Sequence, residues 1–302
     1  MKVFYLKNSE WEEDFFRYDL LCNIGIPMEF VLFNANEIMN LLQDKSCIGN
    51  CIFIVNHVIK FDIMKKIVDL AKPCILFHLS DEHGTRKEWL TLAKTVPCIF
   101  RQYNHIKYDN SYSNIYQIPL GYVKHFLNQR SSLDIPLKLI SQRNISASFV
   151  GEVKSDRQQM CDLFENLENS LIKNVRNRWD ISSLPVSPKE LFDIYSDSIF
   201  VLIGRGNVSL DCFRIYEAVV CGALPVIVGS TKEIYDVFYY NGLHPPFLFF
   251  SSWEKAFDEC KLLLRNKRKL NEKQSDIKQW WITVMSKLRN KIKNILMLSC
   301  KK

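Results

Sequence analysis

Short apolar runs of strand length alternate with helix-length amphipathic segments along most of the chain. The runs are rich in β-branched and aromatic residues, as buried strands are. This alternation is typical of parallel sheets with helices on their faces. In the first half it predicts strands at Val3–Leu6, Glu29–Phe33, Cys51–Asn56, Cys74–Ser80, Pro97–Tyr103 and Asn114–Ile118.

The alternation repeats in the second half, after a polar, serine-rich stretch from Gln129 to Ser146. Such a stretch is typical of a connection, so we place the boundary between two domains there. The strands predicted after it are Ala147–Gly151, Ser198–Gly204, Ala223–Gly229 and Phe247–Phe250. The predicted helices are about Ser155–Lys173, Ser187–Tyr195, Asp211–Cys221 and Trp253–Arg265.

A long basic helix with one apolar face is predicted at about Asn271–Leu298. We expect Trp280 and Trp281 to anchor it to the first domain. The predicted organisation is therefore an acceptor-side Rossmann-like domain at residues 1–140, a nucleotide-sugar-binding Rossmann-like domain at 141–270 and a returning helix at 271–302.

The composition is that of an ordinary globular protein, with 47% hydrophobic and 24% charged residues, and 302 residues suffice for two domains. The formal net charge of +7 is spread along the chain and by itself favours no partner. No apolar run approaches the roughly 20 residues of a membrane span. Charged residues from Glu10 to Arg17 interrupt the place of a secretion signal. We therefore expect a soluble, cytoplasmic protein without a transmembrane anchor.

The ten cysteines are scattered, with no Cys-x-x-Cys pair and no Cys/His group at zinc spacing. They are predicted to be buried free thiols, which fits a reducing compartment. Asp-x-Asp, with which many transferases hold a divalent ion on a diphosphate, is also absent. Neither a metal nor another cofactor is expected.

The candidate chemistry lies between the strand that ends at Gly204 and the helix that follows it. In doubly wound sheets, ligands bind beyond the carboxyl ends of strands, where helix N-termini attract anions. Gly204 and Gly206 let the backbone approach a ligand, and Arg205 between them adds a cation. Ser209 and Asp211 are suited to cap the next helix.

Arg214 and Glu217 lie three residues apart on one face of that helix. One interpretation is that Arg205, Arg214 and backbone amides hold a diphosphate while Glu217 accepts hydrogen bonds from a ribose. The alternative is a helix salt bridge between Arg214 and Glu217 beside a tight glycine turn.

The order of these residues resembles the donor-site signature of the exostosin-like glycosyltransferases, glycosyltransferase family 47. The matching positions are Arg205-Gly206, Ser209, Arg214, Glu217-Ala218 and Gly222–Ile227. Ser148–Glu152 followed by Arg157 resembles the opening of that family's second domain, where Gly151 and Arg157 would add an amide and a cation to the phosphate site. Weaker matches in the first half are Phe77–Glu82, Phe100–Tyr103 and Ile118–Tyr122.

The resemblance implies an α/β fold of the GT-B type, with two doubly wound Rossmann-like domains facing a central cleft and the C-terminal helix packed on the first. It implies an inverting, metal-independent transfer from a UDP-sugar to a hydroxyl of a glycan or glycoprotein acceptor. Xylose is among the first sugars to try, beside glucuronic acid, galactose, arabinose and N-acetylglucosamine.

In an inverting transfer, a carboxylate or histidine removes the proton of the attacking hydroxyl. Candidate bases follow predicted strands of the first domain, and Asp81 is preferred over Glu82 and His83. Ser80 to Glu82 is equally a good helix start, which is the structural alternative for Asp81. The acceptor-side candidates are His57, Arg101 and Tyr103.

A nucleotide or nucleic-acid binding protein without transferase activity is the alternative function. The net charge and Tyr103, Tyr108, Tyr112 and Tyr116 favour it, but a diffuse charge distribution does not, so no nucleic-acid partner is expected. The sequence lacks Gly-x-Ser-x-Gly, a P-loop and a Gly-x-Gly-x-x-Gly after its first strand. Hydrolase and dehydrogenase chemistry are thereby disfavoured.

Overall fold

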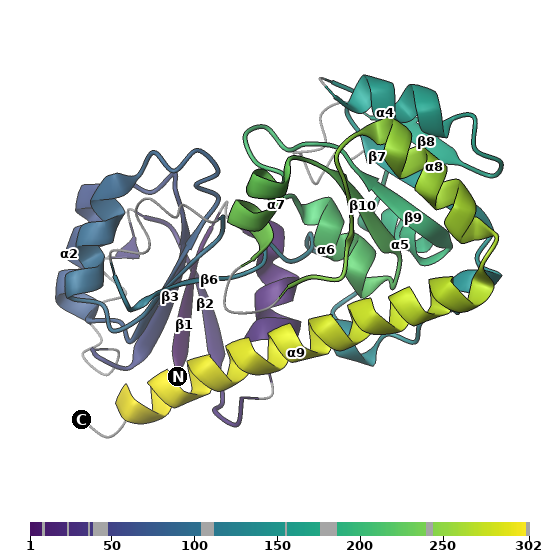
Figure 1. Ribbon diagram of the computed structural model, residues 1–302. Coiled ribbons are helices and arrows are strands. Elements are labelled where there is room, and N and C mark those ends of the chain that lie inside the picture. Colours follow the sequence, from purple (N-terminus) through teal and green to yellow (C-terminus); the bar gives the residue numbers. More distant parts are fainter. Residues whose placement is uncertain are drawn as a thin grey trace. The chain divides into compact units, whose positions relative to one another are not determined.

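The computed structural model describes residues 1–7, 10–22, 24–35, 37–38, 48–103, 112–154, 156–175, 186–239 and 244–299. The chain divides into two compact units, whose elements are labelled in Figure 1. The first unit is Met1–Pro119 with Met285–Lys302, and the second is Leu120–Val284. The division after Pro119 differs from the predicted domain boundary between residues 140 and 141.

The described part of the first unit contains a six-stranded sheet in the order β2-β1-β3-β4-β5-β6, with every neighbouring pair parallel. The six strands that the sequence predicted are all present, with ends that differ by no more than two residues. Their bounds are β1 Lys2–Leu6, β2 Glu29–Phe33, β3 Cys51–Asn56, β4 Ile75–Leu79, β5 Ile99–Arg101 and β6 Ile115–Gln117.

Helix α2, Phe61–Ala71, covers this sheet with a regular apolar face. Met64, Ile67, Val68 and Ala71 recur at helical spacing, are buried, and join the core formed by the strands. A 3₁₀ helix at Lys87–Lys94 adds buried Trp89, Leu92 and Ala93 to the same core. A π-helical segment at Phe15–Leu20 buries further aromatic side chains.

The described part of the second unit contains a five-stranded parallel sheet in the order β11-β10-β9-β7-β8. Its strands are β7 Ile145–Gly151, β8 Leu171–Asn174, β9 Ser198–Ile203, β10 Leu224–Val228 and β11 Leu248–Phe250. Four of the five were predicted from the apolar runs.

The predicted helix at 155–173 is wrong in its second half. Helix α4 spans only Arg157–Phe164, and the chain then turns through Asn169, whose backbone is left-handed with φ of 59°. Residues Leu171–Asn174 pair with β7 as the edge strand β8. The strand was missed because it is short and half polar. Ser155, where the helix was predicted to start, lies outside the described residues.

The remaining helices of the second unit are α5 Pro188–Ser196, α6 Phe213–Val220, α7 Thr231–Phe238 and α8 Trp253–Leu264. Helix α4 packs on α8, and α5 packs on α6. Two of the helices begin with the same cap, in which a serine hydroxyl accepts from the amide of a glutamate three residues later. These pairs are Ser187 with Glu190 at α5 and Ser230 with Glu233 at α7.

The strand order of each sheet fixes where a ligand can bind. In the second unit, the chain runs from β7 outward to β8 and then crosses back to β9 on the other side of β7. Because the crossover direction reverses there, the helices that follow β7 and β9 leave toward opposite faces and open a crevice at the carboxyl ends of the two strands. The first unit has the same reversal between β1 and β3.

Helix α9, Lys267–Ser299, contributes to both units. The expected anchoring of its tryptophans to the first domain is wrong, because they pack within the second unit. The Trp281 indole N–H donates to the Ser132 hydroxyl at 2.7 Å, and the Trp280 ring meets Phe247 edge-on.

The contacts of α9 in the first unit come from basic residues further along the helix. The Arg289 guanidinium approaches the Asp19 carboxylate at 3.7 Å, and the Lys291 ammonium lies 4.1 Å from the centre of the Tyr116 ring. The last turns of the helix therefore pack on the first unit, as the sequence predicted.

The eight cysteines that the structure describes are all free thiols, six of them buried. This agrees with the prediction for these eight positions, while Cys47 and Cys300 lie outside the described residues. Among the described helices, none is both long enough and apolar enough to cross a membrane.

Candidate functional site

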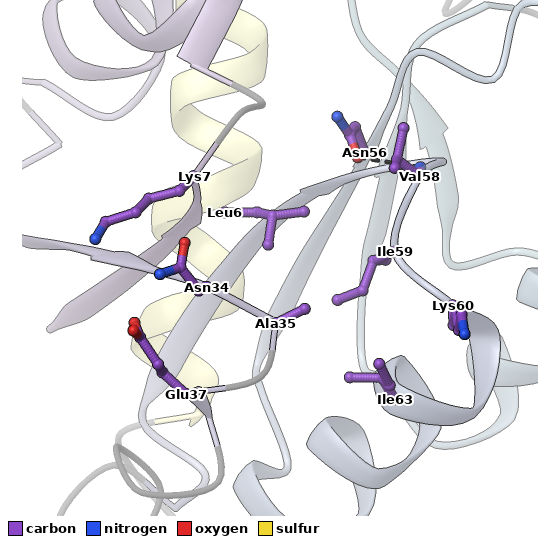
Figure 2. Close-up of a pocket in the computed structure, with 10 residues that line it drawn as sticks. All are labelled: Leu6, Lys7, Asn34, Ala35, Glu37, Asn56, Val58, Ile59, Lys60 and Ile63. Atoms are coloured by element: carbon purple, nitrogen blue, oxygen red, sulfur yellow. Dashed lines mark hydrogen bonds between the residues drawn. The ribbon is translucent and has the colours of Figure 1, made fainter.

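The first unit has a pocket of about 510 Å³ at the carboxyl ends of β1, β2 and β3, where the crossover direction of its sheet reverses. Figure 2 shows Lys7, Asn34 and Glu37 on one side of the pocket and Lys60 and Ile63 on the other. None of the site residues predicted from the sequence is among the residues that line it, although the neighbours of His57 in sequence, Asn56 and Val58, are.

Asp81, the preferred base, follows β4 and is almost fully buried. One carboxylate oxygen accepts from Arg101 Nη2 at 2.9 Å, and the carboxylate also accepts from the backbone amides of Thr85 and Arg86. The carboxylate thus organises the turn ahead of the helix at Lys87–Lys94 and holds a buried ion pair with Arg101. The structural alternative placed a helix start at Ser80 to Glu82, but the N-cap of the following helix is Arg86. Whether Asp81 also serves as a base stays a prediction.

His57 lies at the carboxyl end of β3, next to Asp81 in the neighbouring loop. Its Nδ1 is buried and has no hydrogen-bond partner among the described residues. Burial lowers the pKa of His57, and the nearby Asp81 charge opposes this shift, while Arg86 and His83 add to it. His57 is therefore neutral near pH 7, the form that can accept a proton. His83 itself is exposed, and Glu82 is half-buried.

Tyr103 lies two residues after the end of β5 and is buried, with a left-handed backbone at φ of 60°. Arg101 and Tyr103 are both buried in the first unit, and their place on the acceptor side stays a prediction. Of the tyrosines considered for nucleic-acid binding, Tyr108 lies outside the described residues, and Tyr112 packs against the hydrophobic core.

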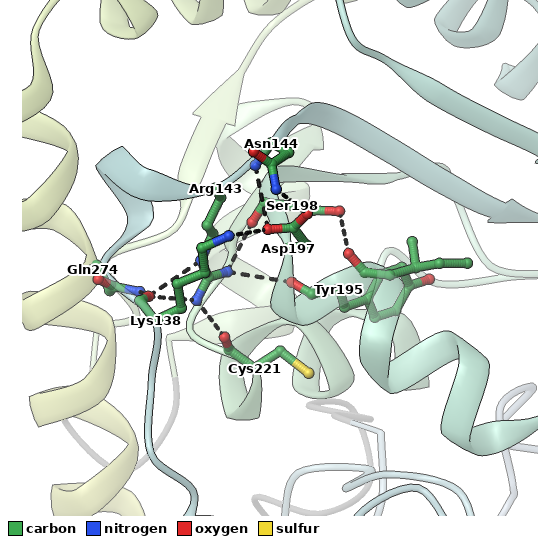
Figure 3. Close-up of polar contacts among 9 residues, drawn as sticks. Lys138, Arg143, Asn144, Tyr195, Asp197, Ser198, Cys221 and Gln274 are labelled. Carbon is green, nitrogen blue, oxygen red and sulfur yellow. Dashed lines mark hydrogen bonds and ion pairs between the residues drawn. The ribbon is translucent and has the colours of Figure 1, made fainter.

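Arginines in the second unit differ in how many of their N–H donors are used within the protein. Arg143 is the example in which all of them are used. Its side chain is buried and donates five hydrogen bonds to the carbonyls of Lys138, Tyr195, Ser198 and Cys221 (Figure 3). Burial lowers the pKa of Arg143 to about 10. A guanidinium has five N–H donors, so this one has none left for a ligand.

Arg214, on the first turn of α6, is equally buried but is far from saturated. Its Nε donates to the Val150 carbonyl at 3.3 Å, its Nη1 reaches the Cys212 sulfur at 3.8 Å, and its guanidinium lies over the Phe149 ring. Gly151, at the end of β7, makes room for it, since a Cβ there would lie 2.5 Å from Arg214 Nη2. In the described structure, Nη2 has no hydrogen-bond acceptor.

Arg157 is placed in the reverse way: it follows β7, and its side chain lies at the end of β9, whereas Arg214 follows β9 and lies at the end of β7. It begins α4, after β7, and its side chain crosses Gly204 at the end of β9, where a Cβ would lie 2.3 Å from Arg157 Cγ. Its Nε donates to the Arg205 carbonyl at 3.1 Å and its Nη1 to the Glu152 carbonyl at 2.8 Å, while its Nη2 contacts the Arg205 carbonyl. Three of its five donors are used.

These two arginines place positive charge at the carboxyl ends of β7 and β9. Neither forms an ion pair with a carboxylate of a described residue. Burial lowers the pKa of Arg157 and the positive charge of Arg214 lowers it further, while the negative charges of Asp156 and Glu152 oppose this shift. A buried charge is costly unless it meets an opposite charge. The geometry therefore fits an anionic ligand that accepts the remaining N–H donors.

Arg205 is already paired, contrary to its predicted role as an open cation. Its guanidinium forms an ion pair with Glu233, with Nη2 3.0 Å from Oε2, and this hydrogen bond raises the pKa of Arg205. Glu233 lies on α7, a helix that was not among those predicted from the sequence. The Ser230-x-x-Glu233 capping pattern was the signal that would have located it.

The predicted capping of α6 by Ser209 and Asp211 is wrong. The N-cap residue is Cys212, with extended backbone and no side-chain cap. The Ser209 hydroxyl instead accepts from the Asp211 amide at 3.1 Å, and the Gly206 amide donates to the Ser209 carbonyl at 2.8 Å. The chain therefore turns between Gly206 and Ser209 after β9, and α6 begins after the extended residue Cys212.

Glu217 lies on α6 with no exposed surface. The alternative of a helix salt bridge between Arg214 and Glu217 is not realised, since Arg214 is directed to the end of β7 instead. Contact of Glu217 with a ribose stays a prediction. The described residues contain no group of three His, Cys, Asp or Glu side chains placed to hold a metal ion.

Solved structures with a similar fold share little sequence with this chain. A mutant of TarM from S. aureus, in complex with fondaparinux, alpha-GlcNAc-glycerol and UDP, superposes with a TM-score of 0.55 at 13% identity, over 87% of this chain and 58% of that one. The DNA-modifying β-glucosyltransferase, described also as T4 phage BGT in complex with UDP and Mn²⁺, gives a TM-score of 0.52 and covers 98% of this chain and 99% of its own. Its identity is 12% in one structure and 13% in the other.

HepE of Anabaena, in complex with UDP and glucose, gives a TM-score of 0.53 at 12% identity, over 97% of this chain and 98% of that one. These similarities show the fold alone. The chain has the α/β fold of GT-B glycosyltransferases, as the sequence predicted.

Similarity in sequence is concentrated in a family whose model covers the second unit and α9. Ribitol-5-phosphate xylosyltransferase 1 of Danio rerio is 22% identical over 213 residues, which make up 63% of this chain and 46% of that protein. This chain thus spans less than half the length of that relative. The RXYLT1 C-terminal domain model matches residues 124–300. The chain belongs to the RXYLT1 C-terminal domain family.

Proposed function

We propose that this chain is a glycosyltransferase that moves a sugar from a UDP-sugar to a hydroxyl group of its acceptor. The observation that carries the proposal is the pair of buried arginines, Arg157 and Arg214, which retain unused donors at the carboxyl ends of the paired strands β7 and β9. A diphosphate supplies the negative charge and the acceptor oxygens that this pair lacks.

The donor role is assigned to the second unit. Gly151 and Gly204 leave room for the arginine side chains to lie against the strand ends. The TarM mutant, T4 phage BGT and HepE structures are complexes with UDP. These likenesses support uridine as the nucleoside, with Arg205 and Glu233 shaping the rim of the site.

The sugar and the acceptor follow from sequence similarity. The zebrafish relative is named a ribitol-5-phosphate xylosyltransferase, which supports xylose as the sugar and a glycan bearing a polyol phosphate as the acceptor. The exostosin-like order of Arg205, Ser209, Arg214 and Glu217 supports inversion at the anomeric carbon.

For inversion, a base of the first unit removes the proton of the attacking hydroxyl while UDP leaves. Asp81 is the base predicted from sequence, but its carboxylate is occupied by Arg101 and two backbone amides. His57 is neutral near pH 7 because burial lowers its pKa, and its buried Nδ1 has no partner in the described structure. We therefore rank His57 beside Asp81 for this role.

Arginine donors replace a metal ion in this proposal. The charge of the leaving diphosphate is met by two guanidinium groups, and the reaction needs no divalent ion to offset it. The same interactions become stronger as negative charge develops on the leaving group, which is the condition for catalysis.

The test is transfer from a panel of UDP-sugars, with UDP release and product mass as readouts. UDP-xylose with a polyol phosphate acceptor is expected to give product, and the anomeric configuration by NMR is expected to be inverted. Arg157→Ala and Arg214→Ala are expected to abolish transfer, while Arg268→Ala on the exposed face of α9 serves as the control. Transfer by both site variants at the rate of the control would contradict the proposal.

A further inference from the structure

The ion pair between Arg205 and Glu233 joins two segments that border the candidate donor site. Arg205 lies in the loop after β9, and Glu233 lies in the first turn of α7, which follows the neighbouring strand β10 (Figure 1). Both Nη atoms of Arg205 contact the carboxylate, with Nη2 3.0 Å from Oε2. The two side chains remain 37% and 29% exposed, and exposed ion pairs contribute little to stability. Stability alone therefore does not account for this pair.

Glu233 is held in place by the start of its helix. It is the third residue of α7, and its backbone amide donates to the hydroxyl of the N-cap residue Ser230 at 3.2 Å. The hydrogen bond from Arg205 lowers the pKa of Glu233, burial opposes this shift, and the charge of Arg205 and the backbone amide of Ser230 add to it. Glu233 is therefore ionised near neutral pH, and its carboxylate is a fixed point for Arg205.

The backbone around Arg205 needs such a fixed point. Arg205 lies between Gly204 and Gly206, and glycine has more conformational freedom than any other residue. The Gly206 amide donates to the Ser209 carbonyl at 2.8 Å, which restrains the chain on one side of Arg205. The ion pair with Glu233 restrains Arg205 itself through its side chain. Together these contacts limit the directions that the Arg205 carbonyl can take.

The Arg205 carbonyl orients the guanidinium of Arg157. Arg157 Nε donates to this oxygen at 3.1 Å, and Arg157 Nη2 contacts the same oxygen. Arg157 Nη1 donates to the Glu152 carbonyl at 2.8 Å, which fixes the other edge of the guanidinium plane. One N–H on each Nη atom of Arg157 is left for a ligand. A shift of the Arg205 carbonyl would therefore change where these two donors point.

The ion pair also offsets the charge of the Arg205 guanidinium. The sequence predicts Arg205 as an open cation for the diphosphate, but in the structure Glu233 occupies both of its Nη atoms. An anionic ligand at the ends of β7 and β9 is then met by Arg157 and Arg214. The contribution of Arg205 to the site is made by its backbone carbonyl.

We propose that Glu233 is a positioning residue of the donor site, which fixes Arg205 so that the Arg205 carbonyl directs Arg157 toward the diphosphate. In this arrangement, neither Glu233 nor the Arg205 guanidinium touches the ligand. The inference rests on the proposed transfer from a UDP-sugar, because it takes Arg157 as a residue that binds the diphosphate.

The experiment is calorimetric titration of the whole chain with UDP, in a double-mutant cycle of Glu233→Gln and Arg157→Ala. Glu233→Gln removes the charge of the carboxylate and keeps its size, and it is expected to weaken UDP binding about threefold to tenfold. In the Arg157→Ala background, Glu233→Gln is expected to have no effect, because the side chain that it positions is gone.

A further variant, Arg205→Gln, loses the ion pair but keeps the backbone carbonyl. It is expected to weaken UDP binding to the same degree as Glu233→Gln, since the two residues act as one unit. A much larger loss in Arg205→Gln than in Glu233→Gln would show that the Arg205 guanidinium binds the ligand directly, and this result would overturn the inference.

The matched control is Glu190→Gln on α5. Glu190 is likewise the third residue after a serine N-cap, Ser187, and its carboxylate pairs with the Lys173 ammonium at 2.6 Å. This control is expected to bind UDP as the wild type does. The melting temperatures of both glutamine variants are expected to stay close to that of the wild type, because both ion pairs are partly exposed. Weaker UDP binding at an unchanged melting temperature separates positioning from a structural role.

Equal loss of UDP affinity from Glu233→Gln in the wild-type and Arg157→Ala backgrounds would overturn the inference, because Glu233 would then act independently of Arg157. UDP affinity of Glu233→Gln equal to or above that of the wild type would also overturn it. UDP binding that depends on Arg157 but not on Glu233 leaves the proposed function standing and overturns this inference alone. A wild type that does not bind UDP contradicts both.

Discussion

Replacing Gly204 by alanine tests whether a glycine is needed at this position to leave space for the Arg157 side chain. An added Cβ would lie 2.3 Å from Arg157 Cγ and 3.0 Å from both Cδ and Nε. Because the contact involves the stem of the side chain, which is held at its far end by the carbonyls of Arg205 and Glu152, the arginine has to leave its position. Overpacking of this kind costs about 1–3 kcal/mol in the free energy of unfolding.

In the Arg157→Ala background, Gly204→Ala is expected to change the free energy of unfolding in the opposite direction and to stabilise the protein. Gly204 does not have a left-handed backbone, so alanine fits its conformation and stabilises by about 0.4–1 kcal/mol through the unfolded chain. Between the wild-type and Arg157→Ala backgrounds, the effect of Gly204→Ala is thus expected to differ by about 2 kcal/mol or more.

The assay is urea unfolding of the four proteins of this double-mutant cycle, followed by tryptophan fluorescence. UDP affinity is measured on the same samples, and Gly204→Ala alone is expected to weaken it. Equal destabilisation by Gly204→Ala in both backgrounds would refute the reasoning, because the glycine would then be required for a reason unrelated to Arg157.

Three further predictions concern acid–base and metal chemistry. Burial raises the pKa of Glu12 to about 7, so the folded state binds the extra proton and stability falls as pH rises from about 4.5 to about 7. Glu12→Gln is expected to remove this slope in pH-dependent unfolding and to stabilise the protein at pH 7 by about 3 kcal/mol, and an unchanged slope would contradict it. His57→Gln is expected to abolish transfer but not UDP binding, and wild-type turnover of this variant would exclude His57 as the base. Asp81→Asn is expected to lower the melting temperature, because Arg101 loses its ion-pair partner. Turnover is expected to survive EDTA, and loss of turnover with recovery on adding Mg²⁺ or Mn²⁺ would show that a metal is needed.

Both sheets could be predicted from sequence because their strands are uninterrupted apolar runs, such as Cys51–Asn56 and Ser198–Ile203. Strand β8 could not, since an edge strand of four residues with two polar members has no distinctive periodicity. Helix α7 could have been found from its Ser230-x-x-Glu233 cap, which was overlooked.

The sequence predicts that the glycines and arginines of the candidate donor site lie together. It does not predict which glycine contacts which arginine. Gly151 makes room for Arg214 and Gly204 makes room for Arg157. These contacts join residues far apart in sequence and depend on the parallel pairing of β7 with β9. For the same reason, sequence spacing gave no sign that Arg205 would pair with Glu233 or Asp81 with Arg101. Which arginine retains donors for a ligand is decided by tertiary contacts.

The central claim is that Arg157 and Arg214 hold a nucleoside diphosphate, and calorimetric titration with UDP tests it most directly. The wild type and the exposed control Arg268→Ala are expected to bind UDP, and each site variant, Arg157→Ala or Arg214→Ala, is expected to bind about tenfold to a hundredfold more weakly. UDP affinity that is the same in all four proteins, or no binding of UDP to the wild type, would contradict the account.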